Sequence, residues 1–226
     1  MHHNISRAAA NRYNIPFTNT AEVLTEATAE FAFFMMGAVA RRLWDSEKLV
    51  REGRWGSWHP FLPFLGDEIT GKVVAVIGTG RIGQAMIKKC TGFDMNILCY
   101  DPVYQNHEFV ASVQQVMDLR HRTGLQRENT WIKYVTLNEA LGQADYVTLH
   151  VPLIREGEPG EPTCHLINEK TLKLMRKEAY LINSSRGPVV DEAALHKALK
   201  QKWIAGAALD VFEREPLPAD SPLRDP

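Results

Sequence analysis

A glycine-rich turn between an apolar run and a helical pattern constrains the fold of this chain more than any other feature. Val73–Ile77 is continuously apolar and is predicted to form a buried strand, and Gly78, Gly80 and Gly83 follow it at the spacing G-x-G-x-x-G. The first glycine of such a turn permits a tight bend, the second lets a diphosphate approach the backbone, and the third lets helix pack on strand. Free N–H groups at the start of the next helix can then bind that diphosphate. The stretch therefore predicts a dinucleotide-binding turn.

An acidic residue stands where such a site needs one. Asp101 ends a second apolar run, Ile97–Tyr100, and lies 18 residues after Gly83. A carboxylate there would accept hydrogen bonds from the adenosine ribose and repel a 2′-phosphate, which favours NAD over NADP as the cofactor. Two alternatives stay open: a preference for NADP, and an ordinary glycine-bearing turn in which Asp101 is a solvated turn residue.

Composition narrows the class of protein. The 226 residues, 45% of them hydrophobic, suffice for one good-sized core or for one domain plus a piece of another. The net charge of −1 gives no reason to expect nucleic acid or an anionic membrane as a partner. The apolar stretch Phe31–Ala40 is too short to span a bilayer. The cysteines are odd in number, show no metal-binding spacing and suggest a reducing, cytoplasmic setting: Cys90, Cys99 and Cys164.

From Gly71 onward, short apolar runs alternate with helical patterns. The predicted strands are Val73–Ile77, Ile97–Tyr100, Tyr146–Val151, Ala179–Ile182 and Ala205–Leu209. The predicted helices are Ile82–Thr91, Leu137–Gly142, Glu169–Met175 and Glu192–Lys200, with capping residues Thr136, Glu139, Asn168 and Asp191. Continuous apolar strands with helices between them indicate a parallel sheet covered on both faces. The expected fold class is therefore α/β, a Rossmann-type doubly wound parallel sheet.

Other segments lie outside this alternation. Helices are predicted at Ser6–Asn14, Thr20–Met36 and Ala38–Gly53. Gly53–Asp67 is expected to be an irregular loop that uses its aromatic residues, Trp55, Trp58, Phe61 and Phe64, for packing or subunit contact. Val103–Val135 is polar and mixed, with a possible helix at Val110–Leu119, and Glu156–Pro162 is predicted to be a surface loop.

The residues that follow the predicted strands should share one rim, since ligands of open parallel sheets bind beyond the carboxyl ends of the strands. These segments are Gly78–Gly83, Asp101, His150–Leu153, Asn183–Gly187 and Asp210–Glu215.

Five stretches along the chain resemble the D-isomer-specific 2-hydroxyacid dehydrogenases, close to the glyoxylate and hydroxypyruvate reductases. They are IPFTNTAEVLTEATAEF, GKVVAVIGTGRIGQA, ADYVTLHVPL, LMRKEAYLINSSRGPVVDEAAL and AGAALDVFEREP, and they cover nearly the whole chain apart from Val103–Val135. The resemblance implies hydride transfer between NADH and a small 2-oxo or 2-hydroxy acid, and a homodimer. It also implies that residues 1–21 are a remnant of the substrate domain and that 22–226 form the NAD-binding domain, with both flanks trimmed.

The same resemblance implies where the cofactor would be held. Its contacts would be Arg81 and Ile82 under the pyrophosphate, Asp101 on the ribose, Val151 and Pro152 beside the adenine, Ser184, Ser185 and Arg186 near the nicotinamide half, Asp210 on the carboxamide, and Thr28 facing the cofactor from the first long helix.

Two catalytic residues are expected. Arg186 can hold a substrate carboxylate bidentately. Glu215 is similar to the family's carboxylate that pairs with the acid/base histidine and raises its pKa. That histidine follows the EP dipeptide in the family, and none of the eight histidines here matches it; His150 is expected to be a core residue. We therefore expect NAD binding with poor turnover. The alternative class is an NAD-sensing, corepressor-like binding protein without catalysis.

Overall fold

The computed structural model describes residues 5–18, 20, 22–60 and 65–224. Phe61 and Phe64, two aromatic residues of the predicted irregular loop, lie outside these ranges. Within the described ranges, every helix is too short or too polar to span a bilayer.

The described residues form one parallel six-stranded sheet. Its strand order is β3-β2-β1-β4-β5-β6, so the chain starts in the middle, builds one half outward and returns to build the other. The strands are β1 (Val73–Ile77), β2 (Asn96–Tyr100), β3 (Ile132–Tyr134), β4 (Tyr146–Leu149), β5 (Tyr180–Asn183) and β6 (Gly206–Leu209). The Rossmann-type doubly wound sheet expected from the sequence is confirmed.

Five of these strands were predicted, and the edge strand β3 was not. β3 lies inside the polar region Val103–Val135 and is three residues long, with an exposed Lys133 at its centre. Its pairing with β2 supplies the order that its own sequence lacks, since Ile132 aligns with Ile97 and Tyr134 with Cys99. A strand this short carries too few alternating positions to be recognised by pattern.

Helices cover both faces of the sheet. They are α1 (Arg7–Arg12), α2 (Thr25–Ala40), α3 (Leu43–Arg51), α4 (Arg81–Thr91), α5 (His107–Arg122), α6 (Leu137–Gln143), α7 (Glu169–Leu172) and α8 (Glu192–Lys200). The predicted caps are confirmed: Thr136 and Glu139 form a capping box, and Asn168 and Asp191 cap α7 and α8 through their side chains.

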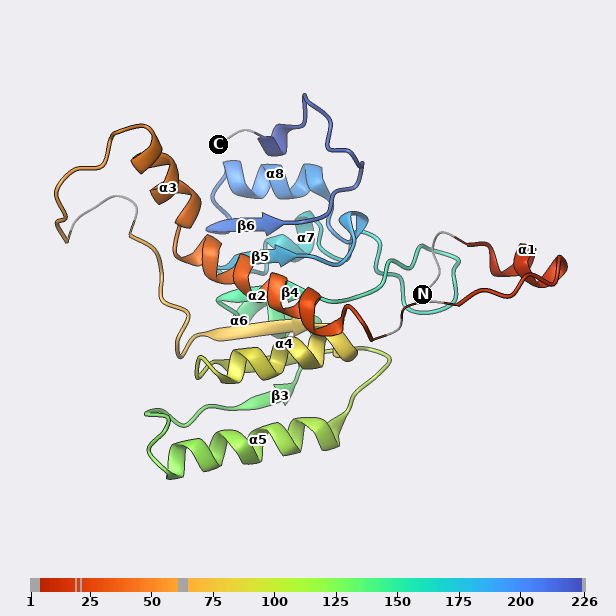
Figure 1. Cartoon of the computed structure of the whole chain (residues 1–226), viewed down its shortest axis with the longest axis horizontal. Coiled ribbons are helices and arrows are strands. Elements are labelled where there is room, and N and C mark those ends of the chain that lie inside the picture. The colour runs from red at the N-terminus through yellow and green to blue at the C-terminus, as the bar shows by residue number, and fades with distance from the viewer. Residues whose placement is uncertain (1–4, 19, 21, 61–64, 225–226) are drawn as a thin grey trace.

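The break between the first two long helices was placed too early. The sequence suggested a boundary near Gly37, but α2 runs on to Ala40, and the chain turns at Arg42, whose φ of 51° is left-handed. Ala40 and Met36 are fully buried, so packing of this last turn against the sheet extends α2 past the glycine. α1 lies apart from the sheet at the right of Figure 1.

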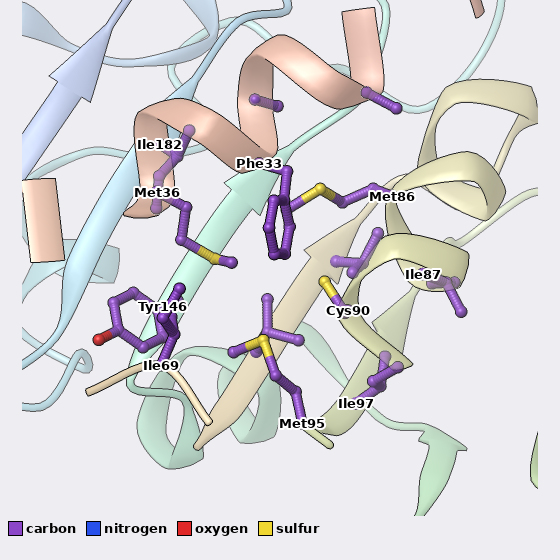
Figure 2. Packing of buried hydrophobic residues seen from close by; sticks show 14 of the residues in the cluster. Phe33, Met36, Ile69, Met86, Ile87, Cys90, Met95, Ile97, Tyr146 and Ile182 are labelled. Atoms are coloured by element: carbon purple, nitrogen blue, oxygen red, sulfur yellow. The ribbon is translucent and has the colours of Figure 1, made fainter. Parts of the chain in front are cut away.

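Two apolar cores result from the alternation of side chains along the strands. Val74 and Val76 of β1 face the core under α2, α4 and α5, whereas Ala75 and Ile77 face the core under α6, α7 and α8. In the first core, Phe33 and Met36 from α2 lie close to Met86 and Cys90 from α4 (Figure 2). The helix that carries the glycine turn is thereby fixed against the centre of the sheet. Cys90 and Cys99 are fully buried in this core, and burial raises the pKa of Cys90 and raises that of Cys99 to about 12.

Truncating the centre of this first core should destabilise the whole domain. Met86 is fully buried between α4 and α2 (Figure 2), so Met86→Ala leaves a cavity and should lower the free energy of unfolding by about 2–5 kcal/mol. Urea unfolding followed by circular dichroism measures this. The matched control is Val116→Ala on α5, where the side chain is 53% exposed and the change should stay within about 0.5 kcal/mol. Equal effects at the two positions would contradict this description of the core.

Candidate functional site

The turn after β1 is built so that only glycine fits at its first position. Gly78 has a φ of 92°, and a Cβ there would lie 2.6 Å from the carbonyl oxygen of His150, directly after β4. Its N–H donates to the carbonyl of Tyr100 at 2.8 Å, at the end of β2. The turn therefore sits where the ends of β1, β2 and β4 meet, which is the switch point of the strand order.

The other two glycines of the motif differ in what surrounds them. A Cβ on Gly83 would lie 2.0 Å from the carbonyl oxygen of Gly78, so α4 packs directly on the turn. Gly80, at the N-cap of α4, is exposed, has an ordinary φ of −66°, and would place a Cβ with no atom within 4 Å. Gly83 is thus required by packing alone, whereas the absence of a side chain at Gly80 keeps space open at the helix end.

The start of α4 offers backbone donors to that space. No side chain caps the helix at Gly80, and the first N–H groups of any helix lack acceptors within it. The side chains of the next two residues do not point to a phosphate role: Arg81 forms an ion pair with Glu22 at 3.2 Å, and Ile82 packs against the first core. The contacts expected of Arg81 and Ile82 would therefore be made by their backbones.

Asp101 binds the glycine turn as well as its own turn. Its Oδ2 accepts from the N–H of Thr79 at 2.9 Å, and its Oδ1 accepts from the N–H groups of Val103 and Tyr104 at 3.0 and 2.8 Å. A carboxylate has about four acceptor positions, so one remains for a ligand. Asp101 is thus a turn residue, as in the alternative in which the glycines form an ordinary turn. Its bond to Thr79 also fixes the predicted binding turn.

A pocket of about 640 Å³ opens beside Asp101. One wall is formed by Asp101, Pro102 and Gln105, and the other by residues 134–139, the end of β3 and the start of α6. The size and place suit an adenosine group. The second wall was missed in the sequence because β3 was missed.

The loop after β5 holds the residues expected near the nicotinamide. Asn183 accepts from the N–H and the hydroxyl of Ser185 at 3.0 and 2.8 Å and donates to the carbonyl of Arg186 at 3.0 Å, which fixes the loop. Ser184 Oγ is buried and has no hydrogen-bond partner among the described residues. A buried hydroxyl without a partner is costly, so this atom is a natural contact for a bound ligand.

The other residues expected to contact the cofactor lie on several elements. Val151 is buried and Pro152 half-buried in the segment after β4, and Thr28 is half-buried on α2. Arg186 is exposed and uses Nη1 to donate to the Ser185 carbonyl at 2.5 Å, which leaves most of its donors available. Asp210 is exposed, and its N–H donates to the carbonyl of Asn183 at 3.0 Å.

Glu215 contacts a nearby backbone group, and its expected pairing with an acid/base histidine stays a prediction. Glu215 Oε1 accepts from the N–H of Phe212 at 3.0 Å. The carboxylate that meets a histidine is Glu213, 3.2 Å from His165 Nε2. The sequence analysis did not identify this pair, in which the His165 side chain is 44% exposed.

His150 is unsuited to proton transfer, as expected. Its Nε2 lies 3.0 Å from Thr148 Oγ1, and loss of solvation lowers its pKa to about 4, so the ring is neutral near pH 7. Of the other histidines, His59 is exposed and His196 is half-buried. Among the described residues, no three His, Cys, Asp or Glu side chains come together as a metal site would require.

A helix without a side-chain cap that begins at a G-x-G-x-x-G turn, at the switch point of a parallel sheet, is typical of a dinucleotide-binding domain. The family model of the D-isomer specific 2-hydroxyacid dehydrogenase NAD binding domain matches residues 33–226. The chain belongs to that family, and its NAD-binding domain is the part matched.

Named relatives agree with this family. The chain is 43% identical over 221 residues to a glyoxylate reductase of Korarchaeum cryptofilum, covering 97% of this chain and 59% of that protein. A solved glyoxylate reductase from Paecilomyes thermophila has a TM-score of 0.78 at 28% identity, covering 99% of this chain and 59% of that one. A D-lactate dehydrogenase from Aquifex aeolicus, solved with NAD and lactic acid, has a TM-score of 0.71 at 32% identity over 92% of this chain and 54% of that one. The chain thus spans less than three-fifths of the length of these relatives.

Substitution of alanine at two of the motif glycines should affect different properties, NADH affinity at Gly80 and thermal stability at Gly83. Gly80→Ala should keep the fold, because its Cβ meets no protein atom, yet weaken NADH binding at least tenfold by filling the ligand's space. Gly83→Ala should lower the melting temperature, because its Cβ would collide with the turn. Calorimetric titration and thermal unfolding measure the two effects. Gly56→Ala, also in open space, is the control and should change neither. Normal NADH affinity in Gly80→Ala would rule out this placement of the diphosphate.

Proposed function

We propose that this chain is the cofactor-binding part of an NAD(H)-dependent oxidoreductase that interconverts a small 2-oxo acid and the D-2-hydroxy acid, of the glyoxylate or hydroxypyruvate type. The observation that carries the proposal is the open space at Gly80, the N-cap of α4, next to Thr79, whose N–H donates to Asp101. NADH, when bound, supplies the hydride. The proposed division is a substrate-domain remnant at residues 1–21 and the NAD-binding domain at 22–226.

The residues proposed to hold the cofactor lie along one rim. The backbone N–H groups of Arg81 and Ile82 would bind the diphosphate at the N-terminus of α4. The free acceptor position of Asp101 would take a ribose hydroxyl, which supports NAD over NADP. At the other end, the unpartnered hydroxyl of Ser184 and the exposed carboxylate of Asp210 would meet the nicotinamide half.

Substrate chemistry is proposed to depend on Arg186. Reduction of a 2-oxo acid needs a cation for the carboxylate, and an exposed guanidinium with free donors meets that need with bidentate geometry. The proton for the developing alkoxide is normally supplied by a general acid, which contributes about 10²–10⁴-fold to the rate. Glu215 is proposed to act through an acid/base histidine, and His150, neutral and enclosed, does not fill that role.

A protein of these 226 residues is therefore expected to bind NADH but reduce glyoxylate slowly. Calorimetry with NADH measures binding, and the loss of NADH absorbance on addition of glyoxylate measures turnover. The Gly80→Ala variant serves as the control and should bind NADH at least tenfold more weakly, with no faster turnover. Binding without fast turnover supports the proposal. Glyoxylate reduction at the rate of a typical dehydrogenase, about 1–10³ per second, would contradict the assignment of slow turnover, and no NADH binding at all would contradict the function.

The proposed assembly is a homodimer through α2, α3 and the loop after them. Large apolar side chains are exposed there, among them Phe34 at 68%, Trp44 at 59% and Trp58 at 71%. Exposed apolar residues gathered on one surface are typical of interaction sites. No membrane or nucleic-acid partner is proposed.

Charge placed on this surface should separate the subunits. The double variant Phe34→Glu with Trp44→Glu should have a monomer mass in light scattering, whereas the unaltered chain should have twice that mass, because carboxylates are not tolerated in a buried interface. Val116→Glu on α5, also about half exposed, is the control and should stay dimeric. A monomeric unaltered chain would refute the proposed dimer.

A further inference from the structure

A chain of hydrogen bonds joins the missed strand β3 to the glycine turn. The hydroxyl of Tyr134, the last residue of β3, accepts from the backbone N–H of Asn106 at 2.9 Å and lies 3.0 Å from Thr79 Oγ1. Thr79 Oγ1 lies in turn 3.0 Å from the carbonyl oxygen of Tyr104. Thr79 is the residue between the first two glycines of the motif and is only 1% exposed, so water does not replace these contacts.

The partners at the two ends of this hydrogen-bond chain favour one direction for its protons. A backbone N–H can only donate and a carbonyl can only accept, so the Tyr134 hydroxyl accepts from Asn106 and the Thr79 hydroxyl donates to the Tyr104 carbonyl. Because Thr79 has only that one hydrogen, the contact between the two hydroxyls is satisfied when Tyr134 donates to Thr79. Asp101 Oδ2 lies 3.5 Å from the Thr79 hydroxyl, too far to compete for its hydrogen. Hydrogen bonds aligned in this way strengthen one another.

The same chain holds Asp101 in place from both sides. Asp101 accepts from the N–H of Thr79 on one oxygen and from the N–H groups of Val103 and Tyr104 on the other. Thr79 and Tyr104 are also the two residues that the Tyr134 chain ties together. Tyr134 itself lines the pocket beside Asp101. The Tyr134 and Thr79 hydroxyls both donate their hydrogens to protein acceptors. A ribose at this pocket would therefore meet a fixed carboxylate, and neither of these hydroxyls could donate to it.

We propose that Tyr134 is a positioning residue of the cofactor site, and that its hydroxyl sets the preference for a free ribose 2′-hydroxyl over a 2′-phosphate. This inference rests on the NAD-binding role proposed for Asp101. A 2′-hydroxyl donates to the carboxylate that Tyr134 holds in place. A 2′-phosphate brings negative charge against that carboxylate, and neither Thr79 nor Tyr134 has a hydrogen left to offer it.

Removing the hydroxyl tests this directly. Tyr134→Phe keeps the aromatic ring but removes the hydroxyl that links Asn106 to Thr79. It should raise the dissociation constant for NADH about fivefold, the usual effect of one lost hydrogen bond. The affinity for NADPH should not fall with it, because a looser Asp101 opposes the phosphate less, so the ratio between the two cofactors should narrow. Calorimetric titration of the 226-residue chain with each cofactor measures this.

An exposed tyrosine away from the sheet provides the matched control. Tyr13 directly follows α1, and its side chain is 66% exposed. Tyr13→Phe should bind both cofactors as the unaltered protein does. Thr79→Val breaks the same chain at its centre and Thr79→Ser keeps it, so these variants decide the matter if Tyr134→Phe does not fold.

The outcomes separate this inference from the function beneath it. A narrowed ratio of NADH affinity to NADPH affinity in Tyr134→Phe or Thr79→Val, with Tyr13→Phe and Thr79→Ser unchanged, supports it. Equal losses for both cofactors, accompanied by a lower melting temperature, would show a merely structural tyrosine and overturn it. Unchanged affinity of Tyr134→Phe for both cofactors would also overturn this inference, but it would leave the proposed NAD-binding function standing. An unaltered chain that binds neither cofactor would overturn the function and this inference together.

Discussion

The structure depends on the close approach of three strand ends to one glycine turn. Gly78 lies against the carbonyl of His150 and bonds to that of Tyr100, and Gly83 brings α4 onto the turn with no room for a methyl group. These contacts force β1, β2 and β4 to end together. α4 begins directly after this turn, with open space around the Cβ position of Gly80, so the candidate site lies at the start of that helix.

The same packing explains why the fold was readable from the sequence and parts of the site were not. Buried central strands are continuously apolar, and helix caps such as Thr136 and Asp191 carry local signals, so five strands and the caps were predicted. β3 gains its order from pairing with β2, and the end of α2 is set by the burial of Ala40; neither is visible in a local pattern. Tertiary contacts decided both.

Site residues divide in a similar way. The roles of Gly78 and Gly83 could be predicted because they follow from backbone sterics at fixed spacing. The double role of Asp101 could not, since its bond to Thr79 joins residues that meet only in the folded chain. The His165–Glu213 pair and the unpartnered Ser184 hydroxyl are likewise products of the folded rim. The cofactor contacts of Val151, Pro152, Ser185 and Thr28, and the roles of Arg186 and Glu215, stay predictions.

The central claim is that backbone amides at the start of α4 hold a diphosphate beside Asp101. Amide chemical shifts of the isotope-labelled chain, recorded as NADH is added, test it most directly because they report each residue separately. We expect the largest shifts at Gly80, Arg81 and Ile82 and in the Asp101–Tyr104 turn, with little change in α8 on the opposite side of the sheet. Saturable shifts confined to residues away from the glycine turn, or none at millimolar NADH, would contradict the claim.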